Sequence, residues 1–188
     1  MKIINVEQRT PAWEEFRLNK ITATMAAPIL GLCPYKTKLD MWNEVMGLKE
    51  RDPMNAFMQR GIDLEDVARK KIEEDTGIMF PPVVVQHSEH DWMMASLDGL
   101  NQGLGIVLEI KCPGKTAMET ARKQIIPAGY YAQMQHQMCV TGYAICYYFV
   151  FDGENGIKMI VERDEGFIKR LIIEEKKFYD MMINMEFV

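Results

Sequence analysis

Apolar residues recur at helical spacing in several segments of this sequence. The longest runs from 54 to 77, where apolar or small residues stand three or four positions apart: Phe57, Gly61, Leu64, Ala68 and Ile72. This spacing predicts a long helix with one face toward a core. A glycine at its end, Gly77, predicts where the helix stops.

Shorter segments carry the same helical pattern. Within 9–31 it predicts a short helix, a break and a second helix, with Thr22 as a possible N-cap and Gly31 as the stop. Further helices are expected over four ranges: 36–47, 114–123, 127–142 and 164–185. Pro127 and Gly142 bound the third of these, as is typical of helix ends.

Continuous apolar runs between turn residues predict strands in the middle of the chain. Three runs, 83–87, 91–100 and 104–113, are joined by short turns, which favours an antiparallel meander. Two more runs, 143–151 and 156–163, flank the turn sequence DGENG and predict a hairpin. The order of elements favours an α/β (mixed α+β) fold, with a central mixed sheet flanked by helices.

Composition narrows the class of protein. The 188 residues are 48% hydrophobic and 26% charged, and no linker-like segment divides them, so residues 1–188 are expected to form one domain. No apolar run reaches the roughly 20 residues of a membrane helix, and the N-terminus lacks a signal-peptide core. We therefore expect a cytoplasmic protein with no membrane partner. The four cysteines match neither a zinc site nor a disulfide framework.

The net charge of −5 argues against a protein that coats nucleic acid with a basic face. It leaves open an enzyme whose positive charge is confined to a channel, because a carboxylate-rich metal site would itself add negative charge.

Two charged residues interrupt the apolar strand predicted at 104–113. Side chains alternate along a strand, so Glu109 and Lys111 share a face, roughly 7 Å apart. The other face is wholly apolar: Ile106, Leu108, Ile110 and Cys112. One interpretation is a half-exposed strand with a surface ion pair, worth ~0–1 kcal/mol and without function.

A second interpretation is a hydrolytic site. Asp98 ends the preceding strand, and a turn across 101–105 can return it beside Glu109. Two facing carboxylates suit Mg²⁺ or Mn²⁺. Lys111 could orient or deprotonate an attacking water, or balance charge on a phosphate. Glu65, at the edge of the apolar stripe in 54–77, is either a boundary glutamate or another metal ligand, direct or through water.

The ordered set of motifs resembles a known nuclease group. Asp-x(10)-Glu-x-Lys after an acidic helix is similar to the PD-(D/E)xK superfamily, with Leu97 in place of the proline. More narrowly, the chain resembles the phage lambda exonuclease and YqaJ-type viral recombinase group. The matching stretches, in order, are AWEEFRLNKITAT, GIDLEDVAR, ASLDGL, LEIKCP, YYAQMQHQMCVTG and VERDE.

This resemblance implies a restriction-endonuclease-like core and a role for each matching residue. It implies that Asp98 and Glu109 hold Mg²⁺ or Mn²⁺ together with the Ile110 backbone carbonyl, and that Lys111 is the catalytic lysine. Glu65 takes the place of the family's helix glutamate.

The resemblance also implies a pocket for the DNA end and a helix beside the active site. Arg17 matches an arginine that contacts the 5′-phosphate, with Thr24 and Ser96 nearby, and Tyr130 and Gln133 match helix residues that line the site. Tyr130, Gln133 and Gln137 stand at i, i+3 and i+7, so they would share one helix face; a polar surface stripe would have the same spacing.

The implied activity is that of an Mg²⁺-dependent, alkaline-type exodeoxyribonuclease. It would digest one strand of linear double-stranded DNA from the 5′ end and leave a 3′ single-stranded overhang. A single-strand annealing protein would take up the overhang in phage-type recombination inside a bacterial host. Relatives suggest a homotrimeric ring. Two alternatives remain: an endonuclease or RecB-like nuclease of the same superfamily, and a catalytically inactive DNA-binding module.

Overall fold

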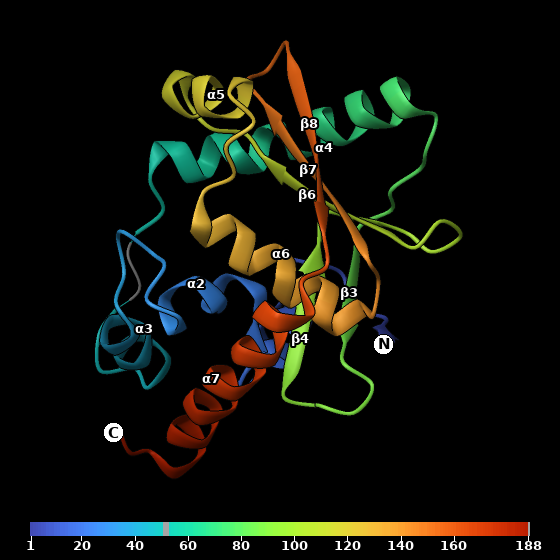
Figure 1. The fold of residues 1–188 in the computed structure, drawn as a ribbon. Coiled ribbons are helices and arrows are strands. Elements are labelled where there is room, and N and C mark those ends of the chain that lie inside the picture. The colour runs from blue at the N-terminus through green and yellow to red at the C-terminus, as the bar shows by residue number, and fades with distance from the viewer. Residues whose placement is uncertain (51–52, 188) are drawn as a thin grey trace.

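The computed structural model describes residues 1–50 and 53–187 and has a mixed α/β fold, with two mixed sheets and helices packed around them (Figure 1). The helices are α1 (Pro11–Arg17), the 3-10 helix η1 (Ala23–Met25), α2 (Ala26–Ile29), α3 (Lys38–Val45), α4 (Ala56–Thr76), α5 (Lys115–Arg122), α6 (Ala128–Thr141) and α7 (Glu165–Asn184). The strands are β1 (Lys2–Ile4), β2 (Ile21–Thr22), β3 (Val83–Gln86), β4 (Met93–Leu97), β5 (Gly99–Asn101), β6 (Ile106–Lys111), β7 (Ile145–Phe151) and β8 (Gly156–Glu162).

The long helices begin and end close to the predicted residues. Helices α4 and α6 both end at a glycine in the left-handed conformation, Gly77 at φ 69° and Gly142 at φ 77°. Thr22 caps η1, as predicted. At α7, the Asp164 side chain accepts a hydrogen bond from the Phe167 backbone N–H at 2.9 Å. These ends were predictable because capping depends on residues only a few positions apart.

The predicted three-strand meander is divided between two sheets. Strands β3 and β4 pair antiparallel within the order β1-β3-β4-β2, whereas β5 and β6 pair antiparallel within the order β5-β6-β7-β8. The chain leaves the first sheet at Leu97 and enters the second at Gly99. A Cβ on Gly99 would lie 2.6 Å from the Phe80 Cβ, so the crossing requires a residue without a side chain.

Pairing between distant segments also departs from an all-antiparallel arrangement. Strands β6 and β7 run parallel, with Glu109 opposite Tyr148, and β7 and β8 form the predicted hairpin. The short strands β1 and β2 were not predicted, because two or three residues are too few to show an alternating pattern.

Helix α4 packs on the second sheet through its second half. Ala68 and Ile72 are buried against Leu108, Ile110 and other residues of β6 and β7. The prediction that Phe57 belongs to the buried stripe is wrong, since its side chain is 74% exposed. The buried residues of α4 are confined to the turns that contact the sheet, and Phe57 stands in its first turn.

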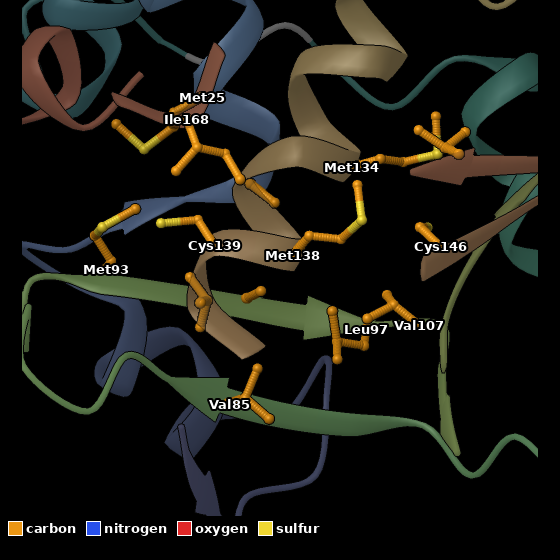
Figure 2. Close-up of a cluster of buried hydrophobic side chains, with 14 of the residues drawn as sticks. Met25, Val85, Met93, Leu97, Val107, Met134, Met138, Cys139, Cys146 and Ile168 are labelled. Atoms are coloured by element: carbon orange, nitrogen blue, oxygen red, sulfur yellow. The ribbon is translucent and has the colours of Figure 1, made fainter. Parts of the chain in front are cut away.

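Helix α6 runs through the middle of the molecule and contacts strands of both sheets as well as α2 and α7 (Figure 1). Figure 2 shows the core on one side of it, where Met134, Met138 and Cys139 pack near Val85 and Leu97 of the first sheet. Ala132 and the eight consecutive residues from 134 to 141 of α6 are buried, so even the polar side chains in this stretch face the interior.

Two of these polar contacts anchor α7. His136 Nδ1 lies 2.8 Å from Glu175 Oε1, and its Nε2 lies 3.0 Å from the Met94 carbonyl oxygen. Both ring nitrogens therefore face acceptors, which only a protonated imidazole satisfies as a double donor. No role was predicted for His136, and its partner on α7, Glu175, is fully buried. Of the helices in the described ranges, none has the length and apolarity to cross a membrane.

Candidate active site

Asp98 occupies the crossing between the two sheets. Since Gly99 pairs with Leu108, the preceding residue, Asp98, comes beside Glu109 of β6. The Asp98 carboxylate accepts a hydrogen bond from the Ile110 backbone N–H at 2.7 Å. The structure thus brings Asp98 and Glu109 together, as the predicted turn required.

Glu109 and Lys111 form an ion pair between a buried carboxylate and a partly exposed ammonium. The Lys111 Nζ lies 2.5 Å from Glu109 Oε1, and the Glu109 side chain is only 1% exposed. The alternative of a surface pair is therefore wrong for Glu109. The strand lies between two packed layers, α4 on one side and α6 on the other, so the face with the charged residues is covered as well.

Helix α6 supplies uncharged amides to the same carboxylate. Gln133 donates to Glu109 Oε1 at 2.7 Å and accepts from the Lys111 ammonium at 3.3 Å. Gln137, one turn later, donates to Glu109 Oε2 at 2.5 Å. Lys111 Nζ also stands 4.9 Å from the centre of the Tyr130 ring. The face carrying Tyr130, Gln133 and Gln137 is thus turned to the site, not to solvent.

The charges in this site perturb one another. Burial, the Glu109 carboxylate and the Glu65 carboxylate together raise the pKa of Asp98 well above its usual range. Burial alone would lower the pKa of Lys111, but Glu109 and Asp98 outweigh it and raise that pKa. In such a setting, an added positive charge would stabilise the ionised form of Asp98.

Glu65 on α4 is held by two arginines. Its carboxylate forms ion pairs with Arg9 and with Arg69, the latter at 2.8 Å. Arg69 Nε also donates to the Asp98 backbone carbonyl at 2.6 Å, so one guanidinium joins α4 to the crossing. No role was predicted for Arg69, although its i, i+4 spacing from Glu65 is the signal of such a pair.

Two of the three residues predicted to bind a DNA end, Arg17 and Ser96, are joined through Trp13. The Arg17 guanidinium carbon lies 4.2 Å above the Trp13 ring, and Trp13 Nε1 donates to Ser96 Oγ at 2.7 Å. Ser96 is two positions before Asp98 on β4. Thr24 is exposed, and its hydroxyl lies 3.2 Å from that of Thr22. The structure therefore brings Arg17 and Ser96 together through Trp13, a residue for which no role was predicted.

The donor atoms at Asp98 and Glu109 fit a hard divalent cation. They are oxygens, and they converge in a buried setting with an excess of negative charge. Within the described residues, no three His, Cys, Asp or Glu side chains form a metal-binding group. Two carboxylates leave coordination positions for water and substrate, as Mg²⁺ sites commonly do.

A family model for the YqaJ-like viral recombinase domain matches residues 12–144. The protein named YqaJ of Bacillus subtilis, described as uncharacterized, is 27% identical over 184 residues. That alignment covers 94% of this chain but only 57% of the relative, so the chain spans little more than half of that protein's length.

Two solved structures of LHK-Exo, an alkaline exonuclease from Laribacter hongkongensis, are similar over 94% of both chains. They have TM-scores of 0.82 and 0.81 and are 27% and 28% identical to this chain; the first contains dAMP. A phage-related exonuclease from Haemophilus somnus 129PT has the same fold, with a TM-score of 0.64 and 17% identity over 88% of this chain and 96% of that one.

Proposed function

Because this chain belongs to the YqaJ-like viral recombinase family, we propose that it is a nuclease, and specifically a metal-dependent exonuclease that acts on double-stranded DNA. The observation that carries the proposal is the convergence of Asp98, Glu109 and Lys111 at the crossing between the sheets. The similarity to the alkaline exonuclease LHK-Exo over 94% of both chains supports it.

Asp98 and Glu109 would hold Mg²⁺ or Mn²⁺, together with the backbone carbonyl of Ile110, the residue between Glu109 and Lys111. Glu65 would act through water, because its carboxylate is already bound by Arg9 and Arg69. The bound metal supplies Lewis-acid polarisation of the scissile phosphate and an acidified water.

The surrounding side chains place a donor where the phosphate reacts. Lys111, held by Glu109 and by the Gln133 carbonyl, keeps one of its three N–H groups, which would stabilise negative charge on the phosphate. Tyr130 limits the movement of the lysine by lying against its ammonium. Asp98 keeps its orientation through the Ile110 N–H.

Selection of a 5′ end would depend on Arg17. Its planar guanidinium can bind two phosphate oxygens, and stacking on Trp13 restrains it close to Ser96. Together with the exposed hydroxyl of Thr24, this group would receive the terminal 5′-phosphate, so that digestion proceeds 5′ to 3′ and leaves a 3′ overhang for a single-strand annealing protein.

We further propose one nuclease domain over residues 1–188, because the site draws on both sheets and on α4 and α6. The expected assembly is a homotrimeric ring around DNA in the cytoplasm of a bacterial host, encoded by a phage or prophage. Light scattering of the purified chain tests the assembly, and a monomer at all concentrations would contradict it.

A cleavage assay on three duplexes of the same sequence tests the activity: linear with 5′-phosphate, linear with 5′-hydroxyl, and covalently closed circular. We expect Mg²⁺-dependent loss of one strand from the phosphorylated linear DNA and no loss from the circle. Cutting of closed circles would support an endonuclease instead, and no metal-dependent loss of any substrate would support an inactive binding module.

The role of Arg17 has a matched control. Arg170 lies 5.8 Å from the Phe167 ring on α7, so it is also an arginine against an aromatic ring, but far along the chain from Asp98. Arg17→Ala is expected to remove the preference for phosphorylated ends, and Arg170→Ala to retain it. An unchanged preference in Arg17→Ala would take Arg17 out of the end-binding group.

A further inference from the structure

Gln137 of α6 is fully buried, and its side-chain amide donates a hydrogen bond to the Glu109 carboxylate. We propose that Gln137 is a positioning residue that fixes the Glu109 carboxylate so that only one lone pair, on Oε2, stays open to a divalent cation. This inference rests on the proposed metal site and specifies how one of its ligands is presented.

The hydrogen bonds of Glu109 leave little capacity for a cation. An ionised carboxylate offers about four lone-pair positions, two on each oxygen. Oε1 accepts from Gln133 at 2.7 Å and from Lys111 at 2.5 Å. Oε2 accepts from Gln137 at 2.5 Å. One position therefore remains, which makes Glu109 a ligand through a single oxygen and fixes which oxygen it is.

The uncharged amide is the chemistry that such a role requires. An arginine or lysine at 137 would also orient the carboxylate, but it would neutralise the charge that draws a cation. An amide donates a hydrogen bond and leaves the negative charge in place. Gln133 and Gln137 together hold both oxygens of Glu109 without adding a positive charge.

The other end of the Gln137 amide supports the same interpretation. Gln137 is fully buried, and its Oε1 has no hydrogen-bond partner among the residues that the structure describes. A buried acceptor without a partner is unfavourable for folding. Turning the amide over would place that oxygen against the Glu109 carboxylate, so contact with Glu109 determines the orientation even though the acceptor stays unpaired.

The chain offers a matched control on the same helix. Gln135 is also fully buried, and its amide donates to the Glu162 carbonyl at 2.8 Å and accepts from the Asp164 N–H at 2.9 Å. Gln135 therefore joins α6 to the start of α7 and makes no contact with Glu109. Replacing it tests what the loss of a buried glutamine does to folding alone.

The experiment measures Mn²⁺ binding to the full chain without DNA, by electron paramagnetic resonance of the free ion. Gln137→Met keeps the length of the side chain and removes the donor, and is expected to bind Mn²⁺ about 10–100-fold more weakly. Gln135→Met is expected to lower the melting temperature and to keep the Kd for Mn²⁺. In cleavage assays, Gln137→Met should need more metal for half-maximal rate and recover much of its kcat when metal is saturating.

Gln137→Asn provides a second variant if the methionine variant does not fold, because it keeps the amide but shortens it by one methylene. It should also bind Mn²⁺ more weakly. Binding as tight as in the unmodified chain, in either folded variant, would overturn the inference while leaving the proposed function intact. If the unmodified chain binds no Mn²⁺, the proposed metal site and this inference both fail.

Discussion

Two buried glutamates that hydrogen-bond to side chains of α6 show how burial alone differs from function. Glu109 is 1% exposed and Glu175 is fully buried. Glu175 receives His136, whose ring nitrogen lies 2.8 and 3.0 Å from its two oxygens, so one carboxylate faces one cation. Glu109 receives two uncharged amides and one ammonium, while a second carboxylate, Asp98, lies close enough to have its pKa raised.

These two regions differ in the net charge that remains after the ion pairs are formed. At Glu175 one cation balances one carboxylate, so the contact joins α6 to α7 and leaves no net negative charge to attract a metal ion. Around Glu109, the carboxylates of Glu109 and Asp98 face the ammonium of Lys111, and a buried excess of negative charge costs free energy unless a cation balances it. Excess charge, more than burial, distinguishes the candidate active site.

The largest expected effect comes from removing negative charge at the site formed by Asp98 and Glu109. Asp98→Asn should lower the cleavage rate by about 10²–10³-fold or more, because a metal-binding oxygen and its charge are lost. The melting temperature should stay level or rise, since the substitution relieves repulsion from Glu109 and Glu65. Cleavage and thermal unfolding of the same preparation measure both. Activity within tenfold of that of the original chain would contradict a metal-binding role for Asp98.

Breaking the His136–Glu175 pair should have the opposite effect, with stability lost and cleavage retained. Glu175→Gln leaves His136 buried without its anion and should cost roughly 3–5 kcal/mol of unfolding free energy. The cleavage rate per folded molecule should be unchanged. Denaturant unfolding measures the first and a rate normalised to folded protein the second.

The double variant His136→Leu with Glu175→Met sharpens this test. It removes both charges and should restore much of the lost stability, as apolar replacements of buried ion pairs often do. A double variant less stable than Glu175→Gln would argue against an ion pair as the source of the effect.

The pH dependence of stability provides a smaller test. Burial would lower the pKa of His136, but the Glu175 carboxylate and the Met94 carbonyl outweigh it and raise that pKa above 6.5. A raised pKa in the folded state contributes stability that is fully present below about pH 6.5, the unfolded value, and is lost as pH rises through the folded pKa. The difference in unfolding free energy between the original chain and His136→Asn should therefore shrink above neutral pH; a difference that grows with pH would contradict it.

The smallest effect is expected at the start of α7. Asp164→Ala removes the cap that accepts from the Phe167 N–H and should cost about 1 kcal/mol. Because α7 carries Glu175 and none of the predicted site residues, cleavage should not change. Chemical denaturation measures the stability change. A large loss of cleavage would show that α7 also supports the site formed by Asp98 and Glu109.

The sequence by itself determined the elements and the residue types of the site. The ends of α4, α6 and α7, the β7–β8 hairpin and the position of Glu109 and Lys111 on one face of β6 follow from periodicity, caps and turn residues. These signals act over a few positions and leave a readable pattern.

Only the tertiary structure decided how those residues meet. Asp98 reaches the Ile110 N–H across 12 positions, Gln137 reaches Glu109 across 28, and His136 reaches Glu175 across 39. The division of the meander at Asp98, the two arginines on Glu65 and the burial of α6 all depend on packing between distant elements. No local pattern encodes such contacts, because the same helix or strand forms whichever partner covers it.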